Sequence, residues 1–231
     1  MSSVPERSGL VVAVDGPSGS GKSSTARGVA ERLGLAYLDT GAMYRAMTWA
    51  LLQGGTDLQD AEAIARDAEG VVITAGTDPR APTIEVDGQD VSGPIRGPDV
   101  TNSVSLVAAV PRVRELLVMR QRDMVESSPD GIVVEGRDIG SAVVPDAPVK
   151  VYLVADPAAR AARRAAELGG LDATATEADL ARRDEIDSTR AASPLAKAAD
   201  AVEIDGTHLT LDQVVDTIVA LVDDVTRAGR A

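Results

Sequence analysis

The sequence contains no cysteine and no phenylalanine among its 231 residues, and it has a single histidine, His208. Without cysteine there can be no disulfide bridges, thiolate zinc sites or cysteine nucleophiles. One histidine cannot form a multi-histidine metal site, and its place in a Gly-Thr-His loop argues for solvent exposure and against a serine–histidine triad. Much of catalytic chemistry is therefore excluded before any motif is considered.

Basic residues and long apolar runs are also scarce. The chain has 23 Lys and Arg against 36 Asp and Glu, which gives a net charge of −13. This charge repels polyphosphates, so long nucleic acids and anionic membranes are not expected partners. No apolar run reaches the roughly 18–20 residues needed to span a bilayer, and the polar start lacks a signal-peptide core. We therefore expect a cytoplasmic protein with one core and an inserted subdomain.

The regular elements predict an α/β fold. Residues 10–14 are an unbroken apolar run with β-branched side chains, typical of a parallel strand buried on both faces. A glycine loop and a helical pattern from Lys22 to Leu33 follow it. Further strands are expected at residues 36–38, 131–134, 149–154 and 201–205. Helices are expected at residues 41–53, 61–68 and 99–125 with a break at Pro111, and after a capping box at Thr210.

Two segments depart from this pattern. Residues 70–98 carry many glycines and prolines around short apolar pieces at residues 71–73 and 83–86, with Asp87-Gly88 as a hairpin turn. We therefore expect a small antiparallel insertion whose strands are these two pieces. Residues 156–190 consist largely of Ala, Arg, Asp and Glu around Gly169-Gly170. They contain too little apolar material for a core of their own. We expect this segment to project as a mobile arm.

The strongest motif is Gly16-Pro-Ser-Gly-Ser-Gly21-Lys22-Ser23, which fits the phosphate-loop pattern G-x-x-x-x-G-K-[ST]. A glycine loop that only turns the chain is the alternative, but the flanking strand and helix are the context that the motif requires. Glycines let backbone N–H groups surround a phosphate at the positive end of the helix. Lys22 is expected to bridge the β- and γ-phosphates, and Ser23 to hold Mg²⁺.

The same loop serves switches, motors and kinases. A nucleotide switch needs an Asn-Lys-x-Asp tetrapeptide to read guanine, and the sequence has none. A motor needs a strand that ends in acidic residues to polarise water, whereas the strand at residues 149–155 is followed by Asp156-Pro157. These absences favour transfer of the phosphoryl group to an acceptor other than water.

Arginines near strand ends are informative in so acidic a protein, because they mark where negative charge on a ligand has to be held. Arg160 and Arg164 lie one helical turn apart, and a second group falls after the strands or on one helical face: Arg45, Arg137, Asp138, Arg183, Asp187 and Arg190. For any single arginine the alternative is a solvated surface position or an ion pair. As a set they predict an acceptor pocket beside the donor loop, and hence two phosphorylated ligands.

Four further segments, taken in order after the phosphate loop, make the chain resemble the bacterial cytidylate kinases. They are Asp39-Thr-Gly-Ala-Met-Tyr-Arg45, Glu135-Gly-Arg-Asp-Ile-Gly140, Pro145-Asp-Ala-Pro-Val-Lys150, and Arg183-Asp-Glu-Ile-Asp-Ser-Thr-Arg190 with Ser193-Pro-Leu195. The resemblance covers about residues 10–225. It departs from the family at Glu135, where Asp is frequent, and in an arm that is a few residues shorter.

The resemblance implies a nucleoside monophosphate kinase fold with a five-stranded parallel sheet flanked by helices. The P-loop core would comprise residues 1–59, 106–164 and 191–231. The small antiparallel insertion, residues 60–105, would bind the monophosphate, and residues 165–190 would form a short helical lid. The implied activity is Mg²⁺-dependent transfer from ATP to CMP, and to dCMP, by a monomer.

Carried over residue by residue, the resemblance implies two sets of ligand-binding side chains, with Lys22, Arg137 and Arg183 as the catalytic ones. The ATP set is Gly16, Pro17, Ser18, Gly19, Ser20, Gly21, Lys22, Ser23, Ser24, Arg160 and Arg164. The CMP set is Thr40, Arg45, Ser105, Arg112, Arg137, Asp138, Arg183, Asp187 and Arg190.

The chemistry suggests how these roles divide. Arg45, Arg137 and Arg183 would clamp the acceptor phosphate. Asp138 would accept from the cytosine amino group, Arg112 and Ser105 would read the other edge of the base, and Asp187 would bind a ribose hydroxyl. Two alternatives stay open: a kinase for another small acceptor, such as UMP or a non-nucleotide alcohol, and a nucleotide-binding regulatory module that has lost transfer.

Overall fold

The computed structural model describes residues 9–167, 173–189 and 194–228. Its centre is a five-stranded sheet with the order β2-β6-β1-β7-β8, in which every pair of neighbours is parallel. The strands are β1 (Val11–Asp15), β2 (Ala36–Asp39), β6 (Ile132–Gly136), β7 (Val149–Val154) and β8 (Val202–Asp205). The predicted α/β fold with five parallel strands is confirmed.

Strand β1 lies in the middle of the sheet and shows why its sequence is apolar throughout. It pairs with β6 on one side, Val12 opposite Val133, and with β7 on the other, Val12 opposite Val149. Val12 and Val14 pack into the hydrophobic cluster on one face of the sheet, and Ala13 packs into the cluster on the other. Both faces are buried, as is usual for a parallel sheet covered by helices.

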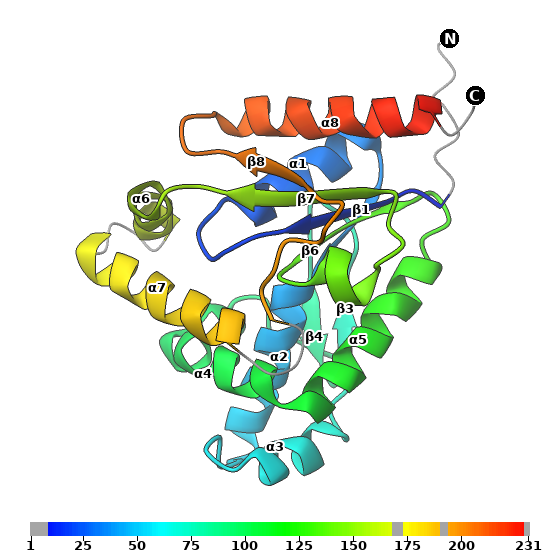
Figure 1. Ribbon diagram of the computed structural model, residues 1–231. Coiled ribbons are helices and arrows are strands. Elements are labelled where there is room, and N and C mark those ends of the chain that lie inside the picture. Colours follow the sequence, from blue (N-terminus) through cyan, green and yellow to red (C-terminus); the bar gives the residue numbers. More distant parts are fainter. Residues whose placement is uncertain (1–8, 168–172, 190–193, 229–231) are drawn as a thin grey trace.

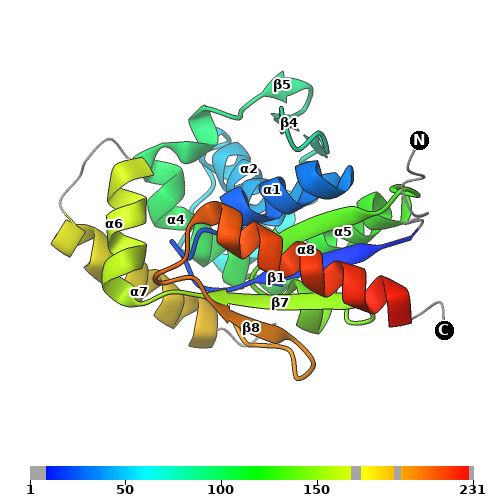
Figure 2. The same cartoon turned by 90° about the horizontal axis from the view of Figure 1, so that it is seen from above.

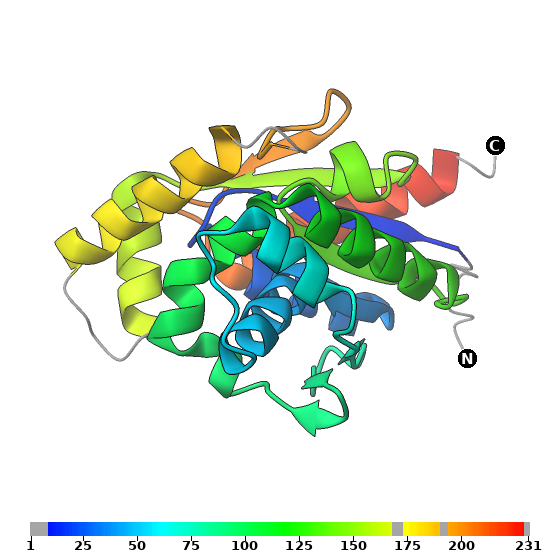
Figure 3. The ribbon, with the colours of Figure 1, turned by 90° about the horizontal axis from the view of Figure 1, so that it is seen from below.

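Helices cover the two faces of the sheet. Helices α1 (Lys22–Leu33) and α8 (Leu211–Ala228) lie on one face, above the sheet in Figure 1, and Figure 2 shows them from that side. On the opposite face, seen from below in Figure 3, lie α2 (Thr40–Gln53) and α5 (Pro111–Glu126), with α4 (Pro98–Ala109) packed beside α2. No helix in the described ranges is both long and apolar enough to cross a membrane.

The capping box at the start of α8 is confirmed. The Gln213 side chain accepts from the Thr210 N–H, and the Thr210 hydroxyl accepts from the Gln213 N–H at 3.3 Å. The apolar face of α8 is buried from Val214 onward, but Leu211 in its first turn is 49% exposed.

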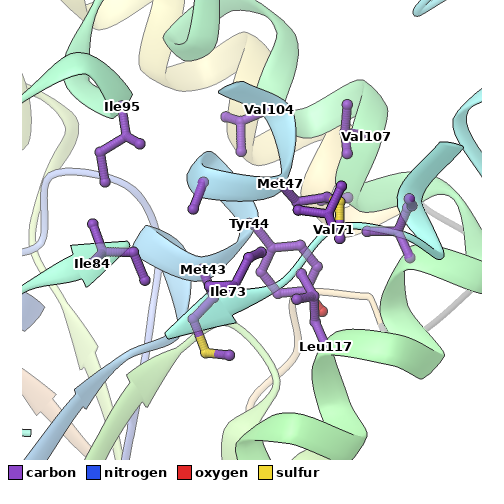
Figure 4. Packing of buried hydrophobic residues seen from close by; sticks show 14 of the residues in the cluster. Met43, Tyr44, Met47, Val71, Ile73, Ile84, Ile95, Val104, Val107 and Leu117 are labelled. Atoms are coloured by element: carbon purple, nitrogen blue, oxygen red, sulfur yellow. The ribbon is translucent and has the colours of Figure 1, made fainter. Parts of the chain in front are cut away.

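The insertion shares its hydrophobic core with the main body. It contains α3 (Ala61–Ala68), the antiparallel strands β3 (Ile73–Ala75), β4 (Ile84–Val86) and β5 (Gln89–Asp90), and the 3₁₀ turn η1 (Pro94–Arg96). Figure 4 shows Ile73 and Ile84 of the insertion in the same cluster as Met43, Tyr44 and Leu117. This packing holds the insertion against α2.

The insertion confirms the predicted hairpin turn and corrects one strand boundary. Asp87 and Gly88 both have positive φ, 50° and 79°, as a two-residue hairpin turn requires. The strand predicted from Val71 begins instead at Ile73. The reason is local: the Val71 N–H donates to Ala68 at the end of α3, and the Val72 N–H donates to the Asp87 carboxylate.

The alanine-rich arm forms two helices, α6 (Pro157–Glu167) and α7 (Ala173–Thr189), which pack on each other beyond the carboxyl end of β7 (Figure 1). They also pack on the glycine loop, where a Cβ at Gly19 would lie 2.9 Å from the Arg160 carbonyl oxygen and 3.2 Å from Leu180. The arm begins at Pro157, and Gly169-Gly170 lie outside the described residues. The prediction that the arm is a mobile lid stays a prediction.

Candidate active site

A pocket opens where β1, β2 and β6 end at their carboxyl edge. Its walls come from the glycine loop, the start of α2, η1, α4, α5, the loop after β6 and the arm helices. Ser23, Ser24, Thr40 and Ser105 all line it, as the sequence predicted. Ligands commonly bind at this edge of a parallel α/β sheet.

The glycine loop is shaped by close backbone approaches. Gly16 has φ 148°, and a Cβ there would lie 2.1 Å from the carbonyl oxygen of Leu153 in β7, so only glycine fits. Gly21, at φ 93°, caps α1. The Lys22 ammonium is buried at the base of the loop and donates to the Pro17 carbonyl at 2.8 Å. Burial, and then Arg137 nearby, lowers the pKa of Lys22, so an anion in the loop would favour its charged form.

The pocket is positive although the protein is strongly acidic. Seven cationic side chains line it, namely Lys22, Arg45, Arg96, Arg114, Arg137, Arg164 and Arg183, against four carboxylates, Asp39, Glu135, Asp138 and Asp187. Burial, and then the neighbouring Arg183 and Arg164, lowers the pKa of Arg45 to about 9. Burial, and then Arg137, lowers the pKa of Arg183 to about 10. A bound anion would relieve this mutual repulsion between half-buried cations.

Arg137 ties the glycine loop to the arm. Its guanidinium donates to the Gly16 carbonyl at 2.9 Å, to the Ser18 hydroxyl at 2.6 Å and to the Asp187 carboxylate of α7 at 2.9 Å. The predicted residues Arg137, Asp187 and Arg183 are thus brought together at one wall. The Nε atom of Arg183 is buried and has no hydrogen-bond partner among the described residues.

A second wall of the pocket is built around Asp138, the first residue after the Gly136-Arg137 pair. Its carboxylate pairs with Arg114 of α5, and both side chains are nearly buried, at 6% and 5% exposed. The Arg114 guanidinium lies 5.6 Å from the centre of the Tyr44 ring, in cation–π range. Buried Ser105 lines the same pocket. This wall can offer a planar ligand both hydrogen-bond donors and acceptors.

Arg112 is not part of the pocket, and the prediction that it reads the base is wrong. Its side chain is 45% exposed and pairs with Glu69 and Glu115, each at 3.1 Å, on the outer face of α5. Arg112 and Arg114 lie two positions apart, and successive helical residues are rotated by about 100°, so they point to nearly opposite sides. The spacing of Arg114, Leu117 and Gln121 marks the buried face and could have identified Arg114.

Of the predicted ATP-binding residues in the arm, one lines the pocket and one does not. Arg164 lines the pocket, whereas Arg160 pairs with Asp184 of α7 and donates to the Ser18 carbonyl at 3.0 Å. Asp184 was not predicted, yet its carboxylate also accepts from the Ser18 N–H at 3.0 Å. Arg163, likewise not predicted, donates to the Ser20 carbonyl. Arg190 lies outside the described residues.

Glu135 is an acidic residue near a strand end, of the kind that a motor needs and that the sequence argument sought after residues 149–155. Strand β6, not β7, lies between β1 and β2, and the Glu135 side chain near its end lies beside Lys22 and Ser23. The Glu135 carboxylate is buried and accepts from the Tyr37 hydroxyl at 2.8 Å, and its backbone carbonyl accepts from the Thr40 hydroxyl at 2.7 Å. Burial, and then Asp39, raises the pKa of Glu135.

The sequence matches one protein family over nearly its whole length. The family model is described as "Cytidylate kinase" and matches residues 12–224. The chain belongs to the cytidylate kinase family. The resemblance drawn from the sequence motifs is thereby confirmed, and with it the class of enzyme, a nucleoside monophosphate kinase.

Curated relatives in this family match the chain over most of its length. A cytidylate kinase of Streptomyces griseus is 57% identical over 217 residues, which cover 94% of each chain. Those of Streptomyces coelicolor and Nocardia farcinica are 54% and 52% identical, and the matches cover 96–98% of this chain. In this member of the cytidylate kinase family, the phosphate loop and the wall formed by Asp138 and Arg114 line the same pocket.

Proposed function

We propose that the protein transfers the γ-phosphoryl group of ATP to CMP, and to dCMP, with Mg²⁺. One observation carries the proposal: a glycine loop of the phosphate-binding pattern and a buried Arg114–Asp138 wall line the same positively charged pocket. The first suits a nucleoside triphosphate and the second suits a base with hydrogen-bonding edges. The cations between them suit the phosphates that have to meet.

The donor side follows from the glycine loop. Its backbone N–H groups and the N-terminus of α1 would hold the β- and γ-phosphates. Lys22 would exchange its bond to the Pro17 carbonyl for the phosphate oxygens, whose negative charge would favour its charged form.

The pocket also fits Mg²⁺, which prefers oxygen ligands. Ser23, Glu135 and Asp39 line it together. No group of three or more His, Asp or Glu side chains in the described part of the chain is arranged to hold a metal alone, so the ion would be shared with the ATP phosphates. Ser23 would hold it directly, with Glu135 and Asp39 close by. When bound, Mg²⁺ neutralises charge on the phosphoryl group being transferred.

The acceptor side is divided between phosphate and base. Arg45, Arg137 and Arg183 would bind the phosphate of CMP with planar, bidentate contacts. Asp138, which is paired with Arg114, would accept from the exocyclic amino group of cytosine, a donor that uracil lacks. Arg114 and Ser105 would take the role first assigned to Arg112 and Ser105. Asp187 would bind a ribose hydroxyl.

The chemistry needs no general base, because the attacking oxygen belongs to an ionised phosphate. That oxygen forms a bond to the γ-phosphorus of ATP while the bond to the β–γ bridging oxygen breaks, giving CDP and ADP. The protein has to align the two groups and offset their repulsion. We assign to the arm helices the exclusion of water, which would otherwise accept the phosphoryl group, with Arg164 and Arg183 carried toward the phosphates as they close.

We also propose that the protein acts as a monomer in the cytoplasm. In the described ranges six large apolar side chains are exposed, and only Leu209 and Leu211 are close together in the sequence; the others are Val72, Leu106, Met119 and Val202. Scattered apolar residues of this kind do not form an interface. Light scattering after gel filtration tests this, and a stable dimer would contradict it.

The function is tested by ADP release with ATP and Mg²⁺ against CMP, dCMP, UMP, AMP and GMP, with a Lys22→Ala control. We expect release that depends on CMP or dCMP and that is lost in the control. Release that ignores the acceptor would mean ATP hydrolysis. Tight ATP binding without release would mean a regulatory module, and a preference for UMP would mean a different acceptor.

A further inference from the structure

Asp15 carries an arrangement that the transfer reaction does not itself use. It is the last residue of β1, it directly precedes Gly16 of the glycine loop, and it is 4% exposed. One of its carboxylate oxygens accepts from the Ile139 N–H and the other from the Gly140 N–H, both at 2.8 Å. A single carboxylate thus holds two successive backbone donors with two good hydrogen bonds.

Those two donors belong to the segment that follows Asp138. After β6 the chain passes through Asp138 into the short π-helix η2 (Ile139–Val143), so the anchored N–H groups are the next two along the chain. The anchor is tightly packed on its other side. A Cβ at Gly140 would lie 3.1 Å from the Lys150 side chain and 3.5 Å from the Asp15 carboxylate. The backbone beside Asp138 therefore has little freedom to shift.

Keeping an ionised carboxylate at this position is unfavourable in itself. Asp15 forms no ion pair with any described residue, and its ionised form is favoured by the two backbone N–H groups and by the charge of Lys22. Burial raises the pKa of Asp15 to about 6, and the neighbouring Asp138 adds to the effect. A buried carboxylate with no ion pair is costly unless it accepts good hydrogen bonds. The two hydrogen bonds of Asp15 hold the backbone of the segment that follows Asp138 in place.

We infer that Asp15 is a positioning residue that fixes Asp138 relative to the glycine loop and so sets the preference for cytosine over uracil. The inference rests on the proposed function, because it takes Asp138 to be the side chain that reads the base. Asp15 ends the strand that opens the donor loop and holds the loop that carries the acceptor-reading residue. It therefore links the two halves of the pocket.

The first test is Asp15→Asn, which keeps the shape of the side chain but offers only one acceptor oxygen. The amide NH₂ would face a backbone N–H, so one of the two hydrogen bonds would be lost. We expect the ratio of kcat/KM for CMP to that for UMP to fall about tenfold, with KM for CMP raised about as much. KM for ATP should stay within about twofold.

A double-mutant cycle separates positioning from a general loss of structure. If Asp15 acts through Asp138, then Asp15→Asn should leave the CMP-to-UMP ratio unchanged in a protein that already carries Asp138→Asn. Ile218→Ala is the matched control, because it opens a cavity under α8 on the opposite face of the sheet. It should lower Tm without changing the ratio.

A second variant, Gly140→Ala, disturbs the same anchor from the other side and keeps the test decisive if Asp15→Asn does not fold. It should lower the ratio in the same direction. A wild-type ratio and CMP KM in either folded variant, or equal effects of Asp15→Asn with and without Asp138→Asn, would overturn the inference. A wild-type enzyme with no preference for CMP would instead overturn the proposed function, and this inference with it.

Discussion

Arg114 shows how one buried cation can be assigned a role from its partners alone. Both it and Asp138 are almost wholly buried, so removing the arginine would break a buried ion pair in the pocket. Such a loss costs about 3–5 kcal/mol. We expect Arg114→Ala to lower kcat/KM for CMP at least 100-fold, whereas Arg112→Ala, on the exposed side of the same helix, should stay within about twofold. Steady-state kinetics on both variants check this, and a larger effect from Arg112→Ala would contradict it.

The two arginines also mark what the sequence could and could not predict at this scale. The glycine loop was predictable because its motif specifies residue types, spacing and flanking elements at once. Arg45, Arg137, Asp138 and Asp187 were predictable from the family motifs. Arg112 was chosen over Arg114 because none of the four family segments includes this part of α5. The helical spacing that places Arg114 on the same face as Leu117 is the signal that separates the two arginines.

The buried carboxylate of Asp15 predicts a pH dependence of stability. Burial raises its pKa from near 4 to about 6, so the folded protein holds this proton more tightly than the unfolded chain does. The contribution of protonated Asp15 to the free energy of unfolding is therefore present at low pH. It is lost as the pH rises from about 4 to about 6, at about 1.4 kcal/mol for each pH unit. The direction is opposite to that of a salt-bridged carboxylate.

We test this direction by comparing wild type with Asp15→Asn in urea at pH 5 and pH 7. Glu135 and the other acids titrate in both proteins, so their contributions cancel in the difference. The difference in free energy of unfolding, Asp15→Asn minus wild type, should be more positive at pH 7 than at pH 5 by roughly 1–2 kcal/mol. A difference that stays constant with pH would show that Asp15 is not titrating in this range.

Helix α7 is the element whose docking depends most on single charges. Asp184 accepts from the Ser18 N–H of the glycine loop and pairs with Arg160 of α6, so it joins both arm helices to the donor site. We expect Asp184→Asn to raise KM for ATP and CMP severalfold, because Arg183 and Asp187 lie on the same helix. Backbone amide hydrogens in the described parts of α6 and α7 should exchange about tenfold faster, because the substitution weakens the charge-assisted contacts of Asp184.

The matched control for this variant is Asp179→Asn on the same helix. Asp179 is exposed and, among the residues that the structure describes, pairs with exposed Arg182 alone, a kind of contact that contributes little to stability. Hydrogen exchange and both KM values should stay at the wild-type level in this control. Equal behaviour of the two variants would show that the arm is docked by its apolar contacts alone.

At the scale of elements, the sequence predicted most of the helices and strands but not how the arm packs. The buried strands and the break at Pro111 follow from local patterns and turn residues. The arm has few apolar residues, and its contacts are polar and long-range, such as Arg160 with Ser18. Hydrophobic periodicity carries no signal for such contacts. The prediction that the arm projects from the body therefore did not include its contacts with the glycine loop.

Across the whole molecule, the strand order decided what local patterns left open. Strand β6 lies beside β1 although more than a hundred residues separate them in the sequence, and this brings Glu135 to the glycine loop. A search for the strand-final acid along the sequence alone examined β7, because the order of strands in a sheet is a property of the fold.

The net charge of −13 predicts how the whole molecule responds to salt. At 0.01 M salt the Debye length is about 30 Å, so the surplus carboxylates repel one another across the protein, whereas at 1 M it is about 3 Å. Salt also weakens exposed ion pairs such as Arg32–Asp216, but each contributes only about 0–1 kcal/mol. We therefore expect Tm at pH 7 to rise by a few degrees between 0.01 M and 1 M sodium chloride.

The control is the same measurement near the sequence pI of about 4.5, where the rise in Tm should vanish because the net charge vanishes. A Tm that falls with salt at pH 7 would mean that ion pairs outweigh the repulsion.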